Sequence, residues 1–223
     1  FDPAADYVHI TTNNTIYGTS FRTNLPPVGN VPLVADMSSN ILSEVYDVSK
    51  FGLIYAGAQK NFGIAGLGIV IIREDLMGHY RENMPVLLDY QLMADKNSMY
   101  NTPPCYSIYI AKLVYDWLMS IGGLEEMKKR NEKKAALLYD YLDSQDYYIA
   151  PVVPEWRSMM NVTFVTGDAE LDKKFAKEAG DAGLKNLKGH RSVGGMRASI
   201  YNAMPLEGVE KLVGIMNDFR KNN

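Results

Sequence analysis

The stretch Phe51–Gly66, FGLIYAGAQKNFGIAG, places Lys60 at the end of an apolar run, with small residues before it and glycines after it. A second apolar run, Leu67–Ile72, follows at once. Lysine is costly to desolvate, and a desolvated lysine has a depressed pKa, so its free amine can condense with an aldehyde to form a Schiff base. The plainer interpretation is a loop lysine that extends to solvent between two strands. This stretch alone favours neither.

An acid lies in a similar position on the preceding strand pattern. The apolar run Val31–Asp36 ends on a carboxylate, and Ser38 and Ser39 follow closely. If the strands are parallel, Asp36 and Lys60 share the rim at which open α/β sheets bind ligands. Pyridoxal phosphate needs such a pair, a lysine for its aldehyde and an acid for its pyridinium nitrogen. An aspartate before serines is also a common turn or N-cap arrangement.

Four blocks of sequence, in order, carry a resemblance to a known family. They are Ala35-Asp36-x-Ser38-Ser39, then Tyr55-Ala-Gly-Ala-Gln-Lys60-Asn61 with Gly63-x-Ala65-Gly66, then Asn101-Thr102-Pro103-Pro104, and finally Gly189–Ala203, GHRSVGGMRASIYNA. Together they resemble the phosphoserine aminotransferases, which are class V aminotransferases and fold-type I pyridoxal-phosphate enzymes. Ile64 departs from the proline usual in that family and leaves the chemistry untouched.

The apolar patterns and turn signals give the expected elements. Short strands are predicted at 7–10, 33–36, 53–56 and 68–72, with a short helix or turn at 40–42. Helices are predicted at 106–120 and 124–143, separated by Gly122-Gly123. Strands at 147–151, 161–165 and 196–201 and helices at 169–182 and 205–220 complete the chain, with Pro205 in the first turn of the last helix.

The resemblance implies an α/β fold, the C-terminal part of a fold-type I transferase. Residues 1–110 would form the C-terminal half of the large cofactor-binding domain, with a mostly parallel sheet and helices. Residues 111–223 would form a smaller α+β domain. An N-terminal portion of the family has no counterpart here, so we expect a fragment that is cleaved, truncated or paired with a separate N-terminal chain. In the family that portion binds the cofactor phosphate and stacks an aromatic side chain on the ring.

The resemblance also assigns roles to residues around the cofactor. Lys60 would bind the pyridoxal aldehyde and move the proton, and Asp36 would hold the pyridinium proton. Gln59 would donate to the cofactor phosphate, and the hydroxyl of Thr15 would contact the ring oxygen. Asn101 and Thr102 would reach the phosphate of the neighbouring subunit, which implies a homodimer with shared sites. Without the resemblance, Gln59 is a turn residue, Thr15 lies in a plain polar turn and Asn101-Thr102 is a helix-entry cap.

A compact basic cluster suggests where the substrate binds. Glutamate and phosphoserine share an α-carboxylate and differ in their second anion, so one site for both needs a bidentate arginine and a second cationic pocket. By resemblance Arg197 takes the α-carboxylate, and His190 and Arg191 help to bind the distal anion. The flanking glycines favour close approach of a ligand, although such a cluster also suits an exposed loop.

Composition excludes several other classes. The net charge of −3 without a long basic stripe argues against nucleic-acid binding, and no apolar run is long enough to span a bilayer. A single cysteine, Cys105, fits a reducing compartment and a cytoplasmic location, and we expect it to be a packing residue. No metal site is indicated. The lysine runs near Lys128 and Lys134 are expected to be solvated surface.

The predicted function is reversible amino transfer between glutamate and 3-phosphohydroxypyruvate in serine biosynthesis, with pyridoxal 5'-phosphate as cofactor. Some relatives also act on the phosphorylated hydroxythreonine precursor of vitamin B6. Two alternatives stay open. One is another class V enzyme, such as an alanine–glyoxylate aminotransferase or a cysteine desulfurase, although neither needs His190, Arg191 and Arg197 together. The other is a non-catalytic fragment or binding module.

Overall fold

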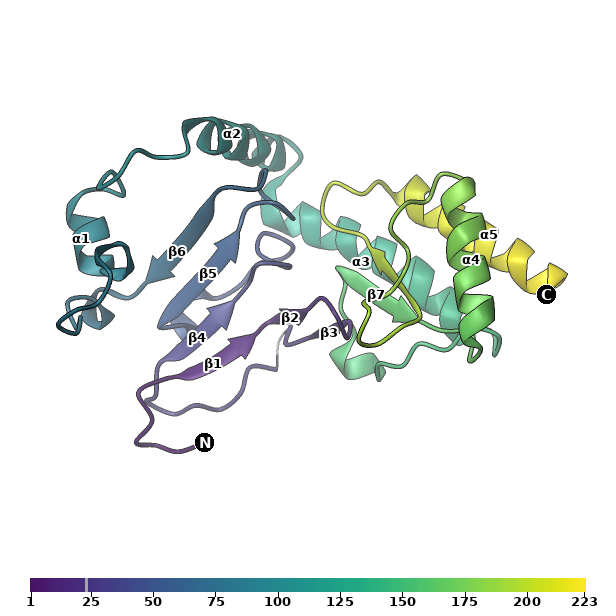
Figure 1. Cartoon of the computed structure of the whole chain (residues 1–223), viewed down its shortest axis with the longest axis horizontal. Coiled ribbons are helices and arrows are strands. Elements are labelled where there is room, and N and C mark those ends of the chain that lie inside the picture. Colours follow the sequence, from purple (N-terminus) through teal and green to yellow (C-terminus); the bar gives the residue numbers. More distant parts are fainter. Residues whose placement is uncertain (23) are drawn as a thin grey trace.

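The computed structural model describes residues 1–22 and 24–223 and consists of two parts arranged along its long axis (Figure 1). The first part is built on one sheet with the strand order β1-β4-β5-β6. Its strands are β1 (Val8–Thr11), β4 (Leu33–Asp36), β5 (Leu53–Gly57) and β6 (Gly68–Ile72). These four strands lie where the apolar runs between turn signals predict them.

Strand direction in this sheet differs from the expectation at one edge. β1, β4 and β5 are parallel, as predicted, and Asp36 lies in register with Thr11 and Tyr55. β6 is antiparallel to β5. A parallel pair needs a crossover of about a dozen residues or more, and the connection 58–67 is shorter than that and contains no helix. The chain therefore turns back on itself directly after Lys60.

Smaller elements complete the first part. A hairpin of β2 (Asn13–Asn14) and β3 (Thr19–Ser20) and the short helix α1 (Tyr90–Asp95) were not predicted. Residues 40–42 form a turn, and α2 (Cys105–Ser120) follows the predicted proline break. Three 3-10 turns lie between them, η1 (Val48–Lys50), η2 (Glu74–Leu76) and η3 (Val86–Leu88). Cys105 is exposed at the first residue of α2, so its predicted packing role is wrong.

The second part packs three helices around a two-stranded antiparallel sheet. The elements are α3 (Gly123–Asp143), η4 (Pro154–Trp156), β7 (Asn161–Phe164), α4 (Ala169–Asp181), β8 (Met196–Ser199) and α5 (Leu206–Asn222). The strand predicted at 147–151 is absent there, because Ile149 makes only a single bridge with Val165. Pro205 is the N-cap of α5, one residue before the predicted position.

Each part has its own buried apolar cluster. The first lies under the sheet and includes Ile54, Phe62 and Ala111, so α2 packs on the first part. The second is larger and includes Leu138, Phe164 and Phe175. The division predicted at residues 110/111 stays a prediction. Within the described residues no helix is long and apolar enough to cross a membrane.

Lys134 is not part of a solvated surface, contrary to the expectation. It is 2% exposed, and its Nζ donates to the backbone carbonyls of Ile200 and Tyr201 at 3.0 and 2.8 Å. Burial lowers the pKa of Lys134 to about 8. The run of charges in sequence hides this, because the helical period turns Lys134 inward while Lys133 stays exposed.

Candidate active site

Lys60 lies on the short connection between β5 and β6, held by its neighbours on both sides. Ala58 and Phe62 are fully buried, and the Phe62 N–H donates to the Ala58 carbonyl. Asn61 is 5% exposed. With these residues turned inward, the half-buried Lys60 side chain extends from the rim, and its Nζ lies 3.4 Å from Thr15 Oγ1.

Thr15 lies at the tip of the β2–β3 hairpin, which contacts the second part of the molecule. Asn14 Oδ1 accepts from the N–H groups of Ile16 and Tyr17 and so shapes the turn. Gly18 has φ +73°, and a Cβ there would lie 2.8 Å from the Asn161 carbonyl. Only glycine fits both the positive φ and this close approach, so the hairpin is fixed beside β7.

Arg197 enters the same space from β8. Its Nη1 donates to the Thr15 carbonyl at 3.4 Å, and its Nε is buried without a hydrogen-bond partner among the described residues. Thr15, Lys60 and Arg197 line one cavity of about 470 Å³ together with Ser199 and Tyr201. The structure thus unites three residues predicted to act on cofactor and substrate, from three separate segments.

Asp36 lies at the end of β4, next to the strand that leads to Lys60. Its Oδ1 accepts from the Ser38 N–H at 2.8 Å, which is the turn geometry that the sequence also allowed. Burial and the charge of Asp36 raise the pKa of Tyr55, the residue in register with it. The Tyr55 hydroxyl also lies 3.0 Å from Nε2 of His9. Asp36 is therefore part of a polar group at the carboxyl end of the parallel strands.

Four predicted cofactor contacts, Asp36, Gln59, Asn101 and Thr102, do not line the cavity that holds Lys60. Gln59 is exposed, and its carboxamide folds back so that Oε1 would lie 2.6 Å from a Cβ at Gly57. Asn101 and Thr102 are exposed before α2, and the Asn101 side chain donates to the Thr102 carbonyl at 3.4 Å. Within the described chain the side chains of Gln59, Asn101 and Thr102 do not enter the Lys60 cavity.

His190 and Arg191 are also separated from Lys60. They lie on the loop before β8, where His190 Nδ1 is 2.7 Å from Ser192 Oγ. Both line a different cavity of about 540 Å³, together with Lys173, Lys177 and Lys188. The basic cluster of the sequence is therefore split, with Arg197 facing Lys60 and the His190-Arg191 pair facing α4.

Besides Lys185 and Asn186, which lie before β8, sequence reasoning missed Ser199 and Tyr201 among the polar residues of the cavity. Both belong to the recognised block around Arg197, and both follow it at spacings of two. Alternate residues of a strand share a face. That period was the available signal, and it would have placed both beside Arg197. Among the described residues, no group of three or more His, Cys, Asp or Glu is arranged to hold a metal ion.

The donor set fits an anionic aldehyde cofactor and an anionic substrate. An amine, a hydroxyl and a guanidinium meet at one cavity, and the unpaired buried Nε of Arg197 leaves a donor for a ligand. A buried donor without a partner is unfavourable by about 1–3 kcal/mol. A bound carboxylate would supply the missing acceptor.

Comparisons with known proteins identify the family. The sequence profile of the family "Aminotransferase class-V" matches residues 1–212. The chain belongs to the class V aminotransferase family. The chain is 60% identical over 213 residues to a phosphoserine aminotransferase of Listeria monocytogenes serovar 1/2a. The matched region covers 96% of this chain and 58% of that protein.

Solved structures of family members have the same fold. One, from a study of radiation damage of the Schiff base in phosphoserine aminotransferase, has a TM-score of 0.95 and 45% identity and covers 100% of this chain and 62% of its own. A second, a PLP-bound phosphoserine aminotransferase from Trichomonas vaginalis, has a TM-score of 0.89 and 41% identity over 95% of this chain and 60% of its own. An alanine–glyoxylate aminotransferase from Nostoc sp., at 17% identity and a TM-score of 0.80 over 96% of this chain and 61% of its own, shares the fold. The chain spans about three fifths of the length of these relatives.

Proposed function

We propose that this chain carries the lysine-bearing part of a phosphoserine aminotransferase. The reaction is amino transfer between glutamate and 3-phosphohydroxypyruvate, with pyridoxal 5'-phosphate as cofactor. The observation that supports it is the meeting of Lys60, Thr15 and Arg197 at one cavity. The names of the relatives in the 41–60% identity range support the same reaction.

Each residue would have a separate task. Pyridoxal phosphate supplies an aldehyde that reacts with amines and a ring that accepts electrons. The Lys60 amine would bind that aldehyde and then, once freed, take and return the proton at the substrate α-carbon. Thr15 would orient the Lys60 amine and donate to the ring oxygen. Asp36 would keep the ring nitrogen protonated, and Gln59 would donate to the phosphate.

Arg197 would bind the α-carboxylate that both substrates share. Its guanidinium can hold a carboxylate through two parallel N–H groups, and its unpaired Nε provides one of them. His190 and Arg191 would bind the distal phosphate or carboxylate. Since they line a different cavity from Lys60, we propose that they act across a subunit boundary.

A homodimer with shared sites would also explain Asn101 and Thr102. Both are exposed and point to no cofactor contact within the chain. They precede α2, on which Tyr106, Tyr109 and Leu113 share one helical face and are 68%, 55% and 44% exposed. An apolar helix face of this kind is typical of a protein interface. A separate N-terminal chain is another partner that would fit the same surface.

The alternatives and finer predictions remain as proposals. An alanine–glyoxylate aminotransferase would share the Lys60 site without need of the His190-Arg191 pair. A non-catalytic fragment would keep the fold without turnover. This alternative is compatible with a chain that matches 58% of its relative's length. The vitamin B6 step and a cytoplasmic location likewise stay predictions.

The first experiment is a visible absorption spectrum of the purified protein with pyridoxal phosphate, before and after glutamate. We expect a band that glutamate converts, and borohydride reduction should fix the cofactor on Lys60. Lys60→Ala should abolish turnover and leave noncovalent cofactor binding. Lys133→Ala, at an exposed lysine of α3 that lines neither cavity, is the matched control. Near-normal rates in Lys60→Ala would overturn the assignment.

Paired arginine variants test the division of substrate binding. Arg197→Ala should weaken glutamate and phosphoserine alike, because both carry the α-carboxylate. Arg191→Ala should act mainly on phosphoserine, whose distal group carries more charge. The two KM values are measured for each variant. The same pattern in both variants would refute the separate roles.

A further inference from the structure

Three buried asparagines donate to three successive backbone carbonyls. Asn61 Nδ2 donates to the Ile41 carbonyl at 2.9 Å, and Asn202 Nδ2 donates to the Leu42 carbonyl at 2.8 Å. Asn131 Nδ2 donates to the Ser43 carbonyl at 2.9 Å. The three side chains are 5%, 7% and 0% exposed, respectively. We refer to Asn61, Asn131 and Asn202 as the asparagine clamp.

The clamp is also linked within itself. Asn131 Nδ2 donates to Asn202 Oδ1 at 2.9 Å, and the Asn202 N–H donates to Asn61 Oδ1 at 3.1 Å. Carbonyl oxygens only accept hydrogen bonds, so each carboxamide must turn its NH2 toward the 41–43 turn. Asn131 Oδ1 is buried without a partner among the described residues, so the side chain is held through its donor contacts alone.

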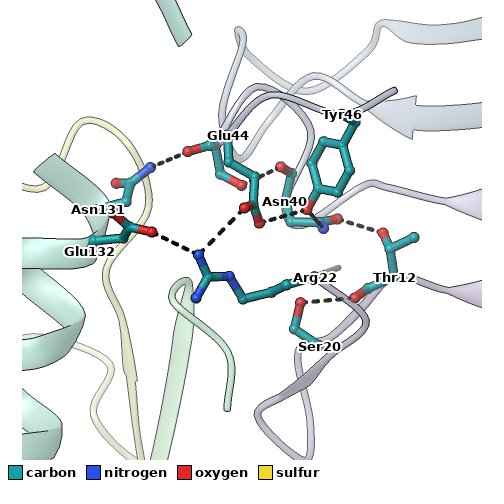
Figure 2. Close-up of polar contacts among 9 residues, drawn as sticks. Thr12, Ser20, Arg22, Asn40, Glu44, Tyr46, Asn131 and Glu132 are labelled. Atoms are coloured by element: carbon teal, nitrogen blue, oxygen red, sulfur yellow. Dashed lines mark hydrogen bonds and ion pairs between the residues drawn. The ribbon is translucent and has the colours of Figure 1, made fainter. Parts of the chain in front are cut away.

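The turn that the clamp holds is not relaxed. Leu42 has φ +60°, a conformation that a branched side chain rarely adopts, at a cost of about 1–3 kcal/mol. Additional contacts fix the same turn from the side of α3. Figure 2 shows Asn131 and Glu132 facing the segment of Asn40, Glu44 and Tyr46, with Arg22 between Glu132 and Glu44. Arg22 Nη2 lies 2.9 Å from Glu132 and 3.5 Å from Glu44.

Each member of the clamp adjoins a segment of the proposed site. Asn61 directly follows Lys60, and Asn202 follows the strand that carries Arg197. The 41–43 turn continues from β4, which ends at Asp36. We propose that the asparagine clamp is a positioning device that fixes the Lys60 amine relative to Arg197. This inference rests on the proposed function for the meaning of those two residues.

Asn131 gives the sharpest test, because it lies on α3 and its hydrogen bonds reach neither Lys60 nor Arg197. Asn131→Ala and Asn131→Leu both remove the donor, and leucine refills the space. Leu138→Ala, a fully buried core residue on the same helix, is the control for lost stability alone. All variants are made in the intact protein and compared at matched global stability in urea.

The first readout is amide hydrogen exchange, which needs neither cofactor nor substrate. Both Asn131 variants should raise exchange about tenfold in residues 58–62 as well as in 41–43, the size expected for loss of one or two buried hydrogen bonds. Leu138→Ala should leave 58–62 unchanged. A rise confined to 41–43, or a rise in Asn131→Ala that Asn131→Leu removes, would overturn the clamp.

The second readout is the split between kcat and KM in glutamate turnover. A misplaced amine should lower kcat about tenfold in both Asn131 variants. Leu138→Ala should leave kcat unchanged, and an unchanged kcat in the Asn131 variants would overturn the positioning role. Absence of turnover in the unmodified protein would favour the non-catalytic fragment over the proposed reaction and would leave the clamp standing, since the exchange result does not depend on turnover.

Discussion

The two parts of the molecule seen in Figure 1 differ in how completely they bury their own apolar side chains. The second part encloses an aromatic cluster in which Phe175 contacts Tyr148, Phe164 and Phe219 edge to face. The first part leaves Tyr109 on α2 55% exposed and Val70 on β6 42% exposed. The second part therefore contains the partners for its own core, whereas the first presents apolar faces that suit a further protein surface.

The largest effect is expected in the enclosed core. Phe175→Ala should lower the free energy of unfolding by roughly 3–5 kcal/mol, because a fully buried ring leaves a cavity among three other rings. Urea titration measures the change. Tyr80→Ala, at a side chain that is 65% exposed, is the control and should change little. Equal losses in both variants would remove the contrast between the two parts.

The buried Lys134 on α3 should make the free energy of unfolding depend on pH. The folded pKa of about 8 lies below the ordinary 10.5, so the unfolded chain binds this proton more tightly. Unfolding thus takes up a proton between these values, and the free energy of unfolding should rise with pH there, by roughly 3 kcal/mol in total. Below pH 8 both states are charged and this contribution is flat.

Lys134→Met should remove that rise. Urea titrations at about pH 7.5 and about pH 10 give the change in each protein, and the difference between the proteins isolates Lys134 from the tyrosines. A rise of the same size in the variant would show that another group titrates.

The buried side chain of Asn13 links the two parts of the molecule by hydrogen bonds. Its Nδ2 donates to Ser39 Oγ and to Asn161 Oδ1, both at 2.8 Å, and its Oδ1 accepts from Ser158. Asn13→Ala leaves these buried groups without a partner, so we expect a loss of roughly 1–3 kcal/mol. Thermal unfolding followed by near-ultraviolet circular dichroism measures it. Asn217→Ala on α5 is the control. An equal loss of stability in that variant would show that the hydrogen bonds of Asn13 between the two parts make no special contribution.

The smallest effect on folding is expected on the open face. Tyr106→Ser should change the free energy of unfolding of the 223-residue chain by less than about 0.5 kcal/mol, because Tyr106 is 68% exposed. If α2 forms the proposed subunit interface, the same variant should weaken self-association, which sedimentation measures. Unchanged association would remove α2 from the interface.

Among the described residues, the sequence was sufficient for every strand except β2 and β3 and for every α-helix except α1. Apolar runs between turn residues located β4, β5 and β6 closely, since a buried strand must be apolar and its ends must turn. The direction of β6 was missed, although the predicted strands 53–56 and 68–72 leave a connection too short for a parallel crossover. The strand predicted at 147–151 does not form. Tyr148 is buried in the core, and Ile149 is the one residue of this segment that pairs with another strand segment, through a single bridge to Val165.

The site shows a similar limit. Lys60 and Asp36 could be singled out from strand ends and residue type alone. The approach of Thr15 and Arg197 to Lys60 could not, because no period in the sequence relates residues on separate elements. That part of the prediction came from family resemblance. Lys134 was misjudged because a run of charges in sequence does not show which of its members faces inward.

The antiparallel turn at Lys60 also bears on the order in which the site is completed during folding. The connection that carries Lys60 joins two strands that are close in sequence. The contact between Lys60 and Thr15 closes a loop of 45 residues, and the contact between Thr15 and Arg197 closes a loop of 182 residues. Long loops close late because more chain entropy must be lost first. A partly folded chain is therefore expected to present the Lys60 amine before the Arg197 guanidinium lies beside it.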